Sequence, residues 1–474
     1  MDSYLKNYIN GAWVESIGGT RHEVINPATE EACTEITLGT TADVDAAVAA
    51  AKAAFKSFSQ TSRDERVALL ENIVAEFKKR IPDLARSMAT EMGAPVSFAG
   101  TAQVGAGLSG FLGTIAALKD FQFSEQVGGG LAVYEPMGVV GMITPWNWPL
   151  NQIALKVAPA LAGGNTMILK PSEECPGCAA ILAEIMHAAG VPAGVFNLVQ
   201  GEGSVVGAAI SAHPGIDMVS FTGSTRAGIM VAKAAADTVK RVHQELGGKS
   251  PNVVLPGADL ASVLPPTASG VLVNAGQSCI SPTRILVQKD DVAAATAIIS
   301  GMYAGTVVGD PLTEGFHMGP VVNKSQFDKI QGLIQSAIDE GAVLETGGTG
   351  LPANVNRGYY VKPTLFSGVT PDMRIAQEEV FGPVATIMSY DTLDEAVDIA
   401  NDTVYGLSAV ISGDPAEAAK VAPRLRAGMV IVNGWGPAPG APFGGYKQSG
   451  NGREAGLFGL RDFMEVKSVV GIPA

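Results

Sequence analysis

The stretch from residue 139 to residue 221 contains four short apolar runs: VVGMI (139–143), TMIL (166–169), VFNLV (195–199) and MVSF (218–221). The runs recur at intervals of roughly two dozen residues, and helical segments separate them. Apolar runs that alternate with helices are typical of βαβ units, whose strands lie parallel in one sheet with helices on both faces. The stretch therefore predicts a doubly wound α/β sheet.

A second series of apolar runs begins downstream of Gly247-Gly248. It implies a second α/β domain, with the domain boundary near these two glycines. The runs are NVVL (252–255), RILV (284–287), TLF (364–366), VATIMS (384–389) and MVIV (429–432).

The segments before and between these series follow other patterns. Asn10-Gly11, between two short apolar segments, is a hairpin signal. Thr40 begins an Ala-rich run that ends near residue 58, and this run and the segment 63–79 predict two amphipathic helices. The glycine-rich run 127–134 predicts a separate hairpin, used for packing or for pairing with another subunit.

The composition favours an enzyme that acts on small molecules. Of 474 residues, 16% are charged and 47% are hydrophobic, and the net charge is -14. A chain without a basic stripe is a poor ligand for nucleic acid or anionic membranes. Polar residues and prolines interrupt the apolar stretches 92–118 and 136–155, so we expect no membrane span. With no signal peptide and only four cysteines, the sequence indicates a reducing cytoplasm.

Two residues carry the chemistry of a covalent enzyme. Cys279 ends the run NAGQSC (274–279), and a cysteine thiol is the best side-chain nucleophile near neutral pH. Glu245 lies upstream in QELGGKSP (244–251), and a carboxylate can deprotonate the water that releases an acyl group from sulfur. The pair indicates covalent chemistry at a carbonyl carbon.

Three further segments follow predicted strands, where open α/β sheets bind ligands. The Asn147 amide in PWNWP (145–149) can donate to an oxyanion, and KPSE (170–173) offers a cation and a carboxylate to a ribose. FTGSTRAG (221–228) offers backbone N–H groups to a pyrophosphate. Each segment also has an ordinary interpretation, as a turn, a solvated helix cap or a plain strand-to-helix connection. They become specific only as a set.

The complete set of motifs resembles the NAD(P)-dependent aldehyde dehydrogenase superfamily over the whole chain. The motifs occur in the family's order, and YING (8–11) and INPAT (25–29) look like the family's start. The motifs are PWNWP (145–149), KPSE (170–173), FTGST (221–225), ELGGKSP (245–251), GQSC (276–279), EEVFGP (378–383) and PFGGYKQSG (442–450).

The resemblance implies a mechanism. Cys279 would add to the aldehyde, and the Asn147 side chain and the Cys279 backbone N–H would hold the oxyanion of the thiohemiacetal. After hydride transfer to the nicotinamide, Glu245 would deprotonate the water that hydrolyses the thioester to a carboxylic acid. Lys156 and Glu454 match positions proposed in the family for relaying protons from this base. An ordinary ion pair or a solvated surface is the alternative for these two residues.

The resemblance also implies NAD as the cofactor. A carboxylate at Glu173 prefers ribose hydroxyls and repels a 2′-phosphate, so NAD is favoured over NADP, although NADP use stays possible. The five histidines show no ligand spacing, and we expect no metal. The implied cofactor contacts are Lys170 and Glu173 at the adenosine ribose, Gly223 and Ser224 at the pyrophosphate, Glu379 at the nicotinamide ribose, Phe381 near the nicotinamide, and also Trp146 and Ser172.

The expected substrate tunnel is aromatic and mainly apolar, which suits medium-sized or aromatic aldehydes. Trp148 stands where many relatives have Phe, and the loop 433–441 is rich in Gly and Pro. The nucleophile is not followed by the arginine that succinate-semialdehyde specialists usually place close by, so a dicarboxylic semialdehyde is less expected. The tunnel residues are Trp148, Ile280, Ser281, Trp435 and Phe443.

The implied fold is α/β and aldehyde dehydrogenase-like. It has a Rossmann-type NAD-binding domain (1–117 and 138–248), a catalytic domain (249–448) and a small β oligomerisation element (118–137 and 449–474). The alternating segment 462–470 predicts a strand. In the family such a strand pairs with the catalytic-domain sheet of a neighbouring subunit, so we expect a homo-oligomer, either a dimer or a tetramer.

Two alternatives to the hydrolytic enzyme stay open. In a CoA-acylating semialdehyde dehydrogenase, coenzyme A would accept the acyl group, but such family branches lack the glutamate found here as Glu245. In a binding or structural protein of the kind found in eye lenses, catalysis would be lost, and Cys279, Glu245 and Asn147 argue against this. CPGC (175–178) lies at a helix start without a thioredoxin-like pattern, so a functional disulfide is not expected.

Overall fold

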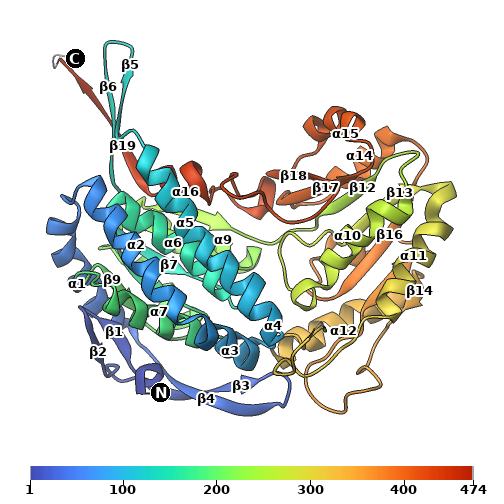
Figure 1. Ribbon diagram of the computed structural model, residues 1–474, viewed down its shortest axis with the longest axis horizontal. Helices are drawn as coiled ribbons and strands as arrows, with labels where there is room; N and C mark the ends of the chain where they lie inside the picture. Colours follow the sequence, from blue (N-terminus) through green and yellow to red (C-terminus); the bar gives the residue numbers. More distant parts are fainter. Residues whose placement is uncertain (1, 316, 472–474) are drawn as a thin grey trace.

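Figure 1 shows the computed structural model, which describes residues 2–315 and 317–471. A first lobe and a second lobe each contain one seven-stranded sheet, and a three-stranded arm projects from the first lobe. A two-stranded ribbon, β3 (Thr20–Asn26) with β4 (Glu31–Leu38), runs along the base of the molecule. Next to its turn, the Tyr359 N–H donates to the Pro27 carbonyl at 2.9 Å, which ties the ribbon to the second lobe.

The sheet of the first lobe is the doubly wound sheet that the apolar runs predict. In order across the sheet, its strands are β11 (Arg241–Glu245), β10 (Met218–Thr222), β7 (Val139–Ile143), β8 (Thr166–Lys170), β9 (Phe196–Leu198), β1 (Asn7–Ile9) and β2 (Ala12–Val14). The first five are parallel, and the β1–β2 hairpin adds on in antiparallel fashion. The carboxyl ends of β7, β8, β10 and β11 therefore meet at one edge, where such sheets bind ligands.

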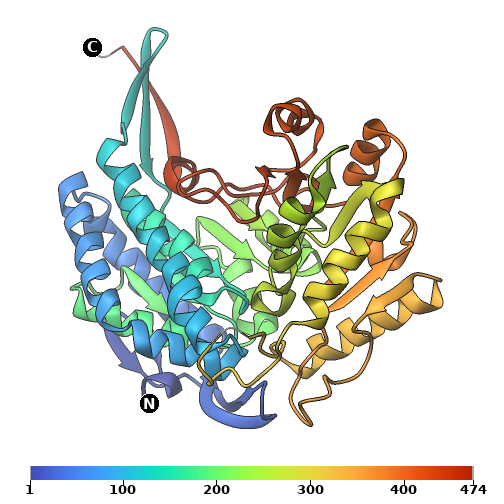
Figure 2. The same ribbon diagram turned by 45° about the vertical axis from the view of Figure 1, so that its right-hand side comes forward.

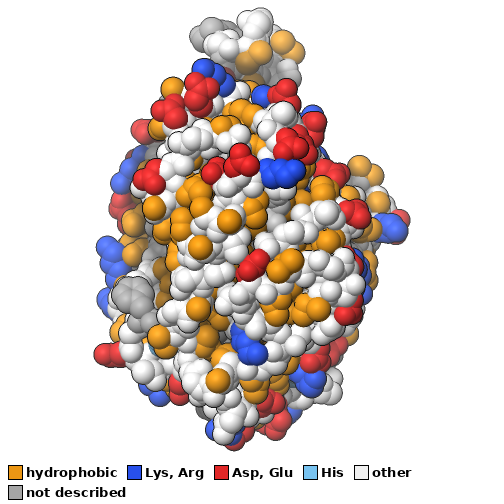
Figure 3. Space-filling view, turned by 90° about the vertical axis from the view of Figure 1, so that its right-hand side faces the viewer, with side chains coloured by type: hydrophobic (Ala, Val, Ile, Leu, Met, Phe, Trp, Pro, Cys, Tyr) orange, Lys and Arg blue, Asp and Glu red, His pale blue; other side chains and the backbone are white. Residues whose placement is uncertain are grey.

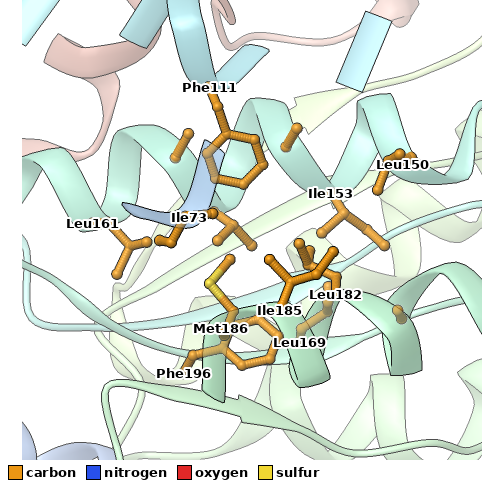
Figure 4. Close-up of a cluster of buried hydrophobic side chains, with 14 of the residues drawn as sticks. Ile73, Phe111, Leu150, Ile153, Leu161, Leu169, Leu182, Ile185, Met186 and Phe196 are labelled. Atoms are coloured by element: carbon orange, nitrogen blue, oxygen red, sulfur yellow. The ribbon is translucent and has the colours of Figure 1, made fainter. Parts of the chain in front are cut away.

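Helices cover both faces of this sheet. One face packs against α1 (Thr41–Phe58), α8 (Ala208–Ala212) and α9 (Thr225–Ala235). The other packs against α2 (Arg63–Lys79), α3 (Ile81–Met92), α5 (Val104–Asp120), α6 (Pro149–Gly163) and α7 (Gly177–Ala188). In Figure 4, Phe111 of α5 and Ile153 of α6 point into the same core as Leu169 of β8 and Phe196 of β9. Burying each such side chain stabilises the fold by about 1.5–3 kcal/mol, so α6 is held firmly on the sheet.

The second lobe repeats this architecture. Its strands, in order across the sheet, are β14 (Val343–Thr346), β15 (Thr364–Ser367), β16 (Val384–Tyr390), β13 (Arg284–Gln288), β12 (Pro251–Val254), β17 (Ser408–Ser412) and β18 (Met429–Val432), and only β14 is antiparallel to its neighbour. One face packs against α10 (Leu260–Leu272) and α11 (Val292–Ala304). The other packs against α12 (Lys324–Asp339), α13 (Arg374–Gln377), α14 (Leu393–Asn401) and α15 (Pro415–Val421).

The arm consists of β5 (Ser124–Val127), β6 (Gly130–Pro136) and β19 (Met464–Val470), and it extends well beyond the body of the molecule in both Figure 1 and Figure 2. β19 follows the short helix α16 (Gly456–Asp462) and pairs antiparallel with β6, with Met464 opposite Pro136. The predicted hairpin at 127–134 and the predicted terminal strand are therefore confirmed. β19 forms one edge of the arm sheet.

Most expected elements are confirmed, and the apolar runs missed three strands. The apolar runs of both series become strands, Asn10 and Gly11 form the β1–β2 turn with φ of 54° and 80°, and the two expected helices are α1 and α2. β11, β14 and β17 are strands that the apolar runs did not predict. β11 and β14 are edge strands with few apolar residues, so the pattern of a buried strand is weak there. The domain limits stay a prediction, although the chain passes between the sheets at 246–250.

One helical stretch in the described chain, Val96–Asp120, is apolar and long enough to cross a membrane by length and composition alone. Its C-terminal part, α5, packs against α2, α6 and α16 in the first lobe. Gly107 and Gly110 lie against Leu150 and Ala154 of α6 so closely that an added Cβ would approach these side chains to 2.7 and 3.1 Å. The packing within the first lobe accounts for the apolar character of one face of this stretch.

The outer face of the second lobe mixes charges of both signs. Figure 3 shows Lys and Arg side chains lying singly among Asp and Glu side chains on this face. Scattered cations of this kind produce no continuous positive field on the side of the molecule that Figure 3 presents.

The CPGC segment lies at the start of α7, where Cys175 and Cys178 are buried as free thiols. The carboxylate of Glu91 in α3 accepts the Gly177 N–H at 2.8 Å and the Ser87 hydroxyl at 2.9 Å. Burial raises the pKa of Glu91 to about 7, although these two hydrogen bonds lower it. A buried carboxyl group thus caps a core helix.

Glu91 makes the stability of the fold dependent on pH. The unfolded chain ionises this carboxyl near its usual value, so between that value and about pH 7 only the folded state keeps the proton. Its contribution is complete below the unfolded pKa and is lost as the pH rises through the folded pKa, by roughly 3 kcal/mol in all. Roughly 1.4 kcal/mol of this loss falls between pH 6 and pH 8.5, because only one pH unit of that range lies below the folded pKa. We expect Glu91→Gln to remove this part, measured by urea unfolding at pH 6 and pH 8.5. The exposed Glu35→Gln variant should lose as much stability as the unsubstituted protein, and an equal loss in Glu91→Gln would contradict the assignment.

Candidate active site

Cys279 lies in the connection between α10 and β13, and the turn before it is left-handed. Asn274, Ala275 and Gly276 have φ values of 55°, 54° and 74°. Such values cost roughly 1–2 kcal/mol at residues with a Cβ, and they persist only where surrounding contacts hold them. A Cβ on Gly276 would lie 2.1 Å from the carbonyl carbon of Gly382, so the position requires glycine.

A network of buried amides holds this turn against the first lobe. The Asn147 carbonyl accepts hydrogen bonds from the Asn274 side chain at 2.7 Å and from the Gln103 side chain at 3.1 Å. The Asn147 side-chain amide donates to the Gln277 carbonyl at 3.0 Å. Asn147 therefore lies beside the backbone that leads into Cys279, as expected for a residue that donates to an oxyanion there.

The Cys279 thiol is half-buried among apolar side chains and near several carboxyl groups. It packs with Ile280, Leu407 and Met429. Burial, with the charges of Glu379 and Glu245, raises the pKa of the Cys279 thiol well above its usual value. In this arrangement the group is a thiol and needs a base to become a nucleophile.

Glu245, the last residue of β11, is a buried carboxyl group with unused hydrogen-bonding capacity. It is 2% exposed, and neither carboxyl oxygen has a hydrogen-bond donor among the described residues. Burial and the charge of Glu454 raise the pKa of Glu245 well above its usual range, while Lys156 opposes the shift. A carboxyl group with a raised pKa is suited to take a proton near neutral pH.

Lys156 of α6 and Glu454 form an ion pair of 2.6 Å, and both side chains are fully buried. The solvated-surface interpretation of these residues is therefore wrong. The pair is adjacent to Glu245, since both Lys156 and Glu454 act on its pKa.

His243 was not among the expected site residues, yet it lies at the centre of this cluster. Its Nε2 atom is 3.9 Å from an oxygen of Glu245 and 3.9 Å from an oxygen of Glu454. Its Nδ1 atom is 2.7 Å from an oxygen of Asp462. The sequence did contain a signal, because residues i and i+2 of a strand share one face, and His243 and Glu245 are so related.

A cavity of about 650 Å³ leads to Cys279. Trp148, Ile280, Trp435 and Phe443 line it, as expected, and every residue of the lining is uncharged. The face of α5 that turns away from the core contributes Ala106, Ser109, Leu112 and Gly113 to the lining, which explains why this face carries no charge there. The Trp148 indole donates to the Ser278 hydroxyl at 2.8 Å and is fixed beside the nucleophile.

Ser281 does not line this cavity. Its side chain is buried, and its N–H donates to the Ser278 carbonyl at 3.0 Å, so the backbone turns back on itself directly after Cys279. Its expected place among the tunnel residues is therefore corrected.

Residues suited to a nucleotide gather at the carboxyl edge of the first sheet. Lys170 ends β8, and its ammonium lies 2.8 Å from the Glu173 carboxylate, which is 28% exposed on its side chain. Burial would raise the pKa of Glu173, but Lys170 outweighs it and lowers the pKa. Ser172 lies between them and is mostly buried. The edge therefore presents an ionised carboxylate to solvent.

The remaining expected cofactor contacts lie at the start of α9, in the loop after α13 and in the loop after β7. Ser224 is the N-cap of α9, where its hydroxyl accepts the Ala227 N–H at 3.3 Å, and Gly223 precedes it. Glu379 accepts the Gly248 N–H at 2.9 Å, and a Cβ on Gly247 would lie 2.5 Å from that carboxylate. Two more residues, Trp146 and Phe381, meet edge to face with ring centroids 5.5 Å apart.

Comparison with known proteins gives one consistent result. The model of the aldehyde dehydrogenase family matches residues 13–469. The chain is 49% identical over 473 residues to 3-succinoylsemialdehyde-pyridine dehydrogenase of a Pseudomonas species, and 46% identical over 472 residues to a putative aldehyde dehydrogenase of Staphylococcus aureus. The match covers 99% of both chains in each case.

Solved structures agree with the sequence matches. A mutant of aldehyde dehydrogenase C from Pseudomonas syringae, crystallised with NAD+ and octanal, superposes with a TM-score of 0.98 at 48% identity, covering 100% of this chain and 98% of that one. The aldehyde dehydrogenase of Bartonella henselae gives a TM-score of 0.96 at 48% identity, covering 98% of both chains. Fold and sequence thus agree from end to end, and the chain belongs to the aldehyde dehydrogenase family as an NAD(P)-dependent enzyme.

Proposed function

We propose that the protein oxidises an uncharged, mainly apolar aldehyde to its carboxylic acid, with NAD+ as the electron acceptor and water as the second substrate. One observation carries this proposal: the Cys279 thiol lies at the uncharged cavity, and its pKa is raised by Glu245, a buried carboxyl group with no hydrogen-bond donor among the described residues. A nucleophile and a base in these surroundings suit the formation and hydrolysis of a thioester.

The reaction begins with the loss of the Cys279 proton. Glu245, whose raised pKa suits it to accept that proton, generates the thiolate, which adds to the aldehyde carbon. The Asn147 amide and the Cys279 N–H stabilise the oxyanion of the thiohemiacetal, which then loses a hydride and becomes a thioester. Glu245 next deprotonates a water that attacks the thioester carbon, and the C–S bond breaks to release the acid and the thiol.

The residues at the sheet edge fit NAD, which accepts the hydride when bound. The Glu173 carboxylate stays ionised next to Lys170, so it can accept hydrogen bonds from ribose hydroxyls and disfavours a 2′-phosphate. The N-terminus of α9 behind Gly223 and Ser224 offers N–H groups to a pyrophosphate. Glu379 is fixed beside Gly248, in reach of a second ribose.

The cavity limits the substrate class. Its uncharged lining would leave a substrate carboxylate without a cation, and an unpaired buried charge is costly. Octanal, present in the Pseudomonas syringae structure, and the pyridine-bearing aldehyde in the name of the Pseudomonas relative are both uncharged. We therefore expect medium-chain or aromatic aldehydes.

The arm supports a homo-oligomer, either a dimer or a tetramer. β19 is an edge strand, and its side chains Val466 and Val470 are 60% and 72% exposed. Exposed apolar side chains on an edge strand favour pairing with another chain. The four cysteines are free thiols, which suits a reducing cytoplasm.

Replacement of the nucleophile should stop turnover and leave the cofactor site intact. We expect Cys279→Ala to lower NADH formation by at least about a thousandfold, while NAD+ affinity by calorimetry changes by less than about threefold. Cys33→Ala, at another half-buried free cysteine, should keep full activity. Turnover by Cys279→Ala at the rate of the unsubstituted enzyme would disprove the assignment.

A matched pair of aldehydes tests the substrate class. Hexanal and 6-oxohexanoate have the same chain length and differ by a terminal carboxylate. We expect kcat/KM to favour hexanal by about a hundredfold, because the uncharged lining leaves the carboxylate unpaired. The assays should run with NAD+ and NADP+ side by side, with NAD+ preferred. Equal kcat/KM values for the two aldehydes would show that another part of the protein supplies a cation.

A further inference from the structure

Oxidation of an aldehyde to a carboxylate releases protons inside a closed site. The balance is RCHO + NAD+ + H2O → RCOO− + NADH + 2H+. The thiol loses its proton at the start, the thiolate released at the end takes back the proton that Glu245 removed from the water, and ionisation of the carboxylic acid gives the second proton. Glu245 takes the thiol proton first but is 2% exposed, so it must pass that proton on before it can deprotonate the water. A route to solvent is therefore part of turnover.

His243 lies where such a route would run. It shares the inward face of β11 with Glu245, and its Nε2 atom is 3.9 Å from the carboxyl oxygens of both Glu245 and Glu454. This is about one ångström beyond hydrogen-bond length. Since the Glu245 oxygens have no donor among the described residues, a rotation of that side chain toward the ring breaks no hydrogen bond.

The other nitrogen of His243 faces outward. Nδ1 is 2.7 Å from Oδ2 of Asp462. Asp462 is the last residue of α16, and its side chain is 35% exposed. The Arg453 N–H fixes the same carboxylate at 2.9 Å. The ring therefore joins a buried carboxyl group to one that touches water.

The ring is also held in place. A Cβ on Gly452 would lie within 2.4–2.5 Å of three ring atoms, so glycine permits the backbone to lie directly against the imidazole. Phe463 packs on the ring with centroids 6.1 Å apart. One ring nitrogen thus faces Glu245 and the other faces Asp462, as a proton carrier between these two groups requires.

We propose that His243 is a proton-relay residue that takes protons from Glu245 at Nε2 and passes them from Nδ1 to Asp462 and solvent. The proposal rests on the proposed function, in which Glu245 is the general base. In each transfer the Glu245 O–H bond breaks, an Nε2–H bond forms, and the proton on Nδ1 leaves to Asp462. The ring is left with its proton on Nε2, and a half-turn that exchanges the positions of the two nitrogens readies it for the next turnover. No electrons move.

The charges around the ring favour this passage. Lys156 and Glu454 form an ion pair of 2.6 Å and neutralise one another. On the other side of the ring, Arg453 and Arg241 lie beside Asp462. The Arg241 guanidinium donates to the Asp462 backbone carbonyl at 3.2 Å, and its charge lowers the pKa of Asp462. When Glu245 loses its proton, a buried negative charge appears beside the ring. The Lys156 ammonium offsets that charge, since it lowers the pKa of Glu245.

Rapid-quench kinetics can separate the relay from the earlier steps. With NAD+ and hexanal, NADH formation reports hydride transfer, and the intact mass of quenched enzyme reports the acyl group on Cys279. We expect His243→Gln to form its first NADH at the rate of the unsubstituted enzyme but to lose the acyl group about ten- to a hundredfold more slowly. Imidazole or formate in the buffer should accelerate this loss, because a small acid–base pair replaces the carrier.

Two further variants complete the experiment. Asp462→Asn, which keeps an acceptor for the Arg453 N–H, should slow acyl release in the same way. His213→Gln is the matched control, since His213 also faces a carboxylate, Asp45 at 3.3 Å, but lies outside the site, and it should behave like the unsubstituted enzyme.

Two results would overturn the relay. One is acyl release from His243→Gln at the normal rate. The other is an equal slowing of the first NADH without rescue by buffer, which would give the ring a structural role only. Glu245→Gln, run in parallel, separates failure of the relay from failure of the proposed function. Acyl release at the normal rate in Glu245→Gln would show that Glu245 is not the base. Slow acyl release in Glu245→Gln, together with normal acyl release in His243→Gln, would reject the relay alone.

Discussion

The contact between Asn147 and the turn before Cys279 is the constraint on which the site depends. Asn147 belongs to the first lobe and follows β7, whereas Cys279 precedes β13 of the second lobe. The Asn147 side-chain amide donates to the Gln277 carbonyl, and the Asn147 carbonyl accepts a hydrogen bond from the Asn274 side-chain amide. These bonds fix the proposed nucleophile, Cys279, relative to the sheet edge that bears the expected cofactor residues. They also hold a left-handed turn that would otherwise relax.

A second constraint comes from charge. Lys156 and Glu454 are fully buried, and the loss of hydration costs several kcal/mol per ion, so the pair is poorly explained as a source of stability. Its position beside Glu245 and His243 gives it another use. In the proposed mechanism Glu245 alternates between its protonated and ionised forms, and the Lys156 ammonium offsets the negative charge of the ionised form.

The strands of both lobes were predictable because buried parallel strands need continuous apolar runs, as in 139–143 and 384–389. β11 was not, because its inward face holds His243 and Glu245 instead of apolar residues. The pairing of Lys156 with Glu454 joins positions 298 residues apart, and no local pattern carries that information. The family resemblance pointed to both residues, but a solvated surface position stayed an alternative for them. The structure excludes that alternative, because both side chains are fully buried.

The same limits apply around the nucleophile. GQSC and PWNWP indicated Cys279 and Asn147, but Gln103 and Asn274 are linked to them only through the fold. Ser281 follows Cys279 closely in sequence, and yet the turn after Cys279 buries it away from the cavity. Closeness to Cys279 in sequence therefore did not predict which side chains line the cavity, because the backbone turns back after Cys279.

The central claim is that Cys279 carries the acyl group and that Glu245 is needed to release it to water. Peptide mass spectrometry of Glu245→Gln, quenched after incubation with NAD+ and hexanal, tests this most directly. The account predicts a hexanoyl group retained on the peptide that contains Cys279, with one NADH formed per site. Formation of NADH without an acyl group on that peptide, or with release that requires coenzyme A, would contradict it.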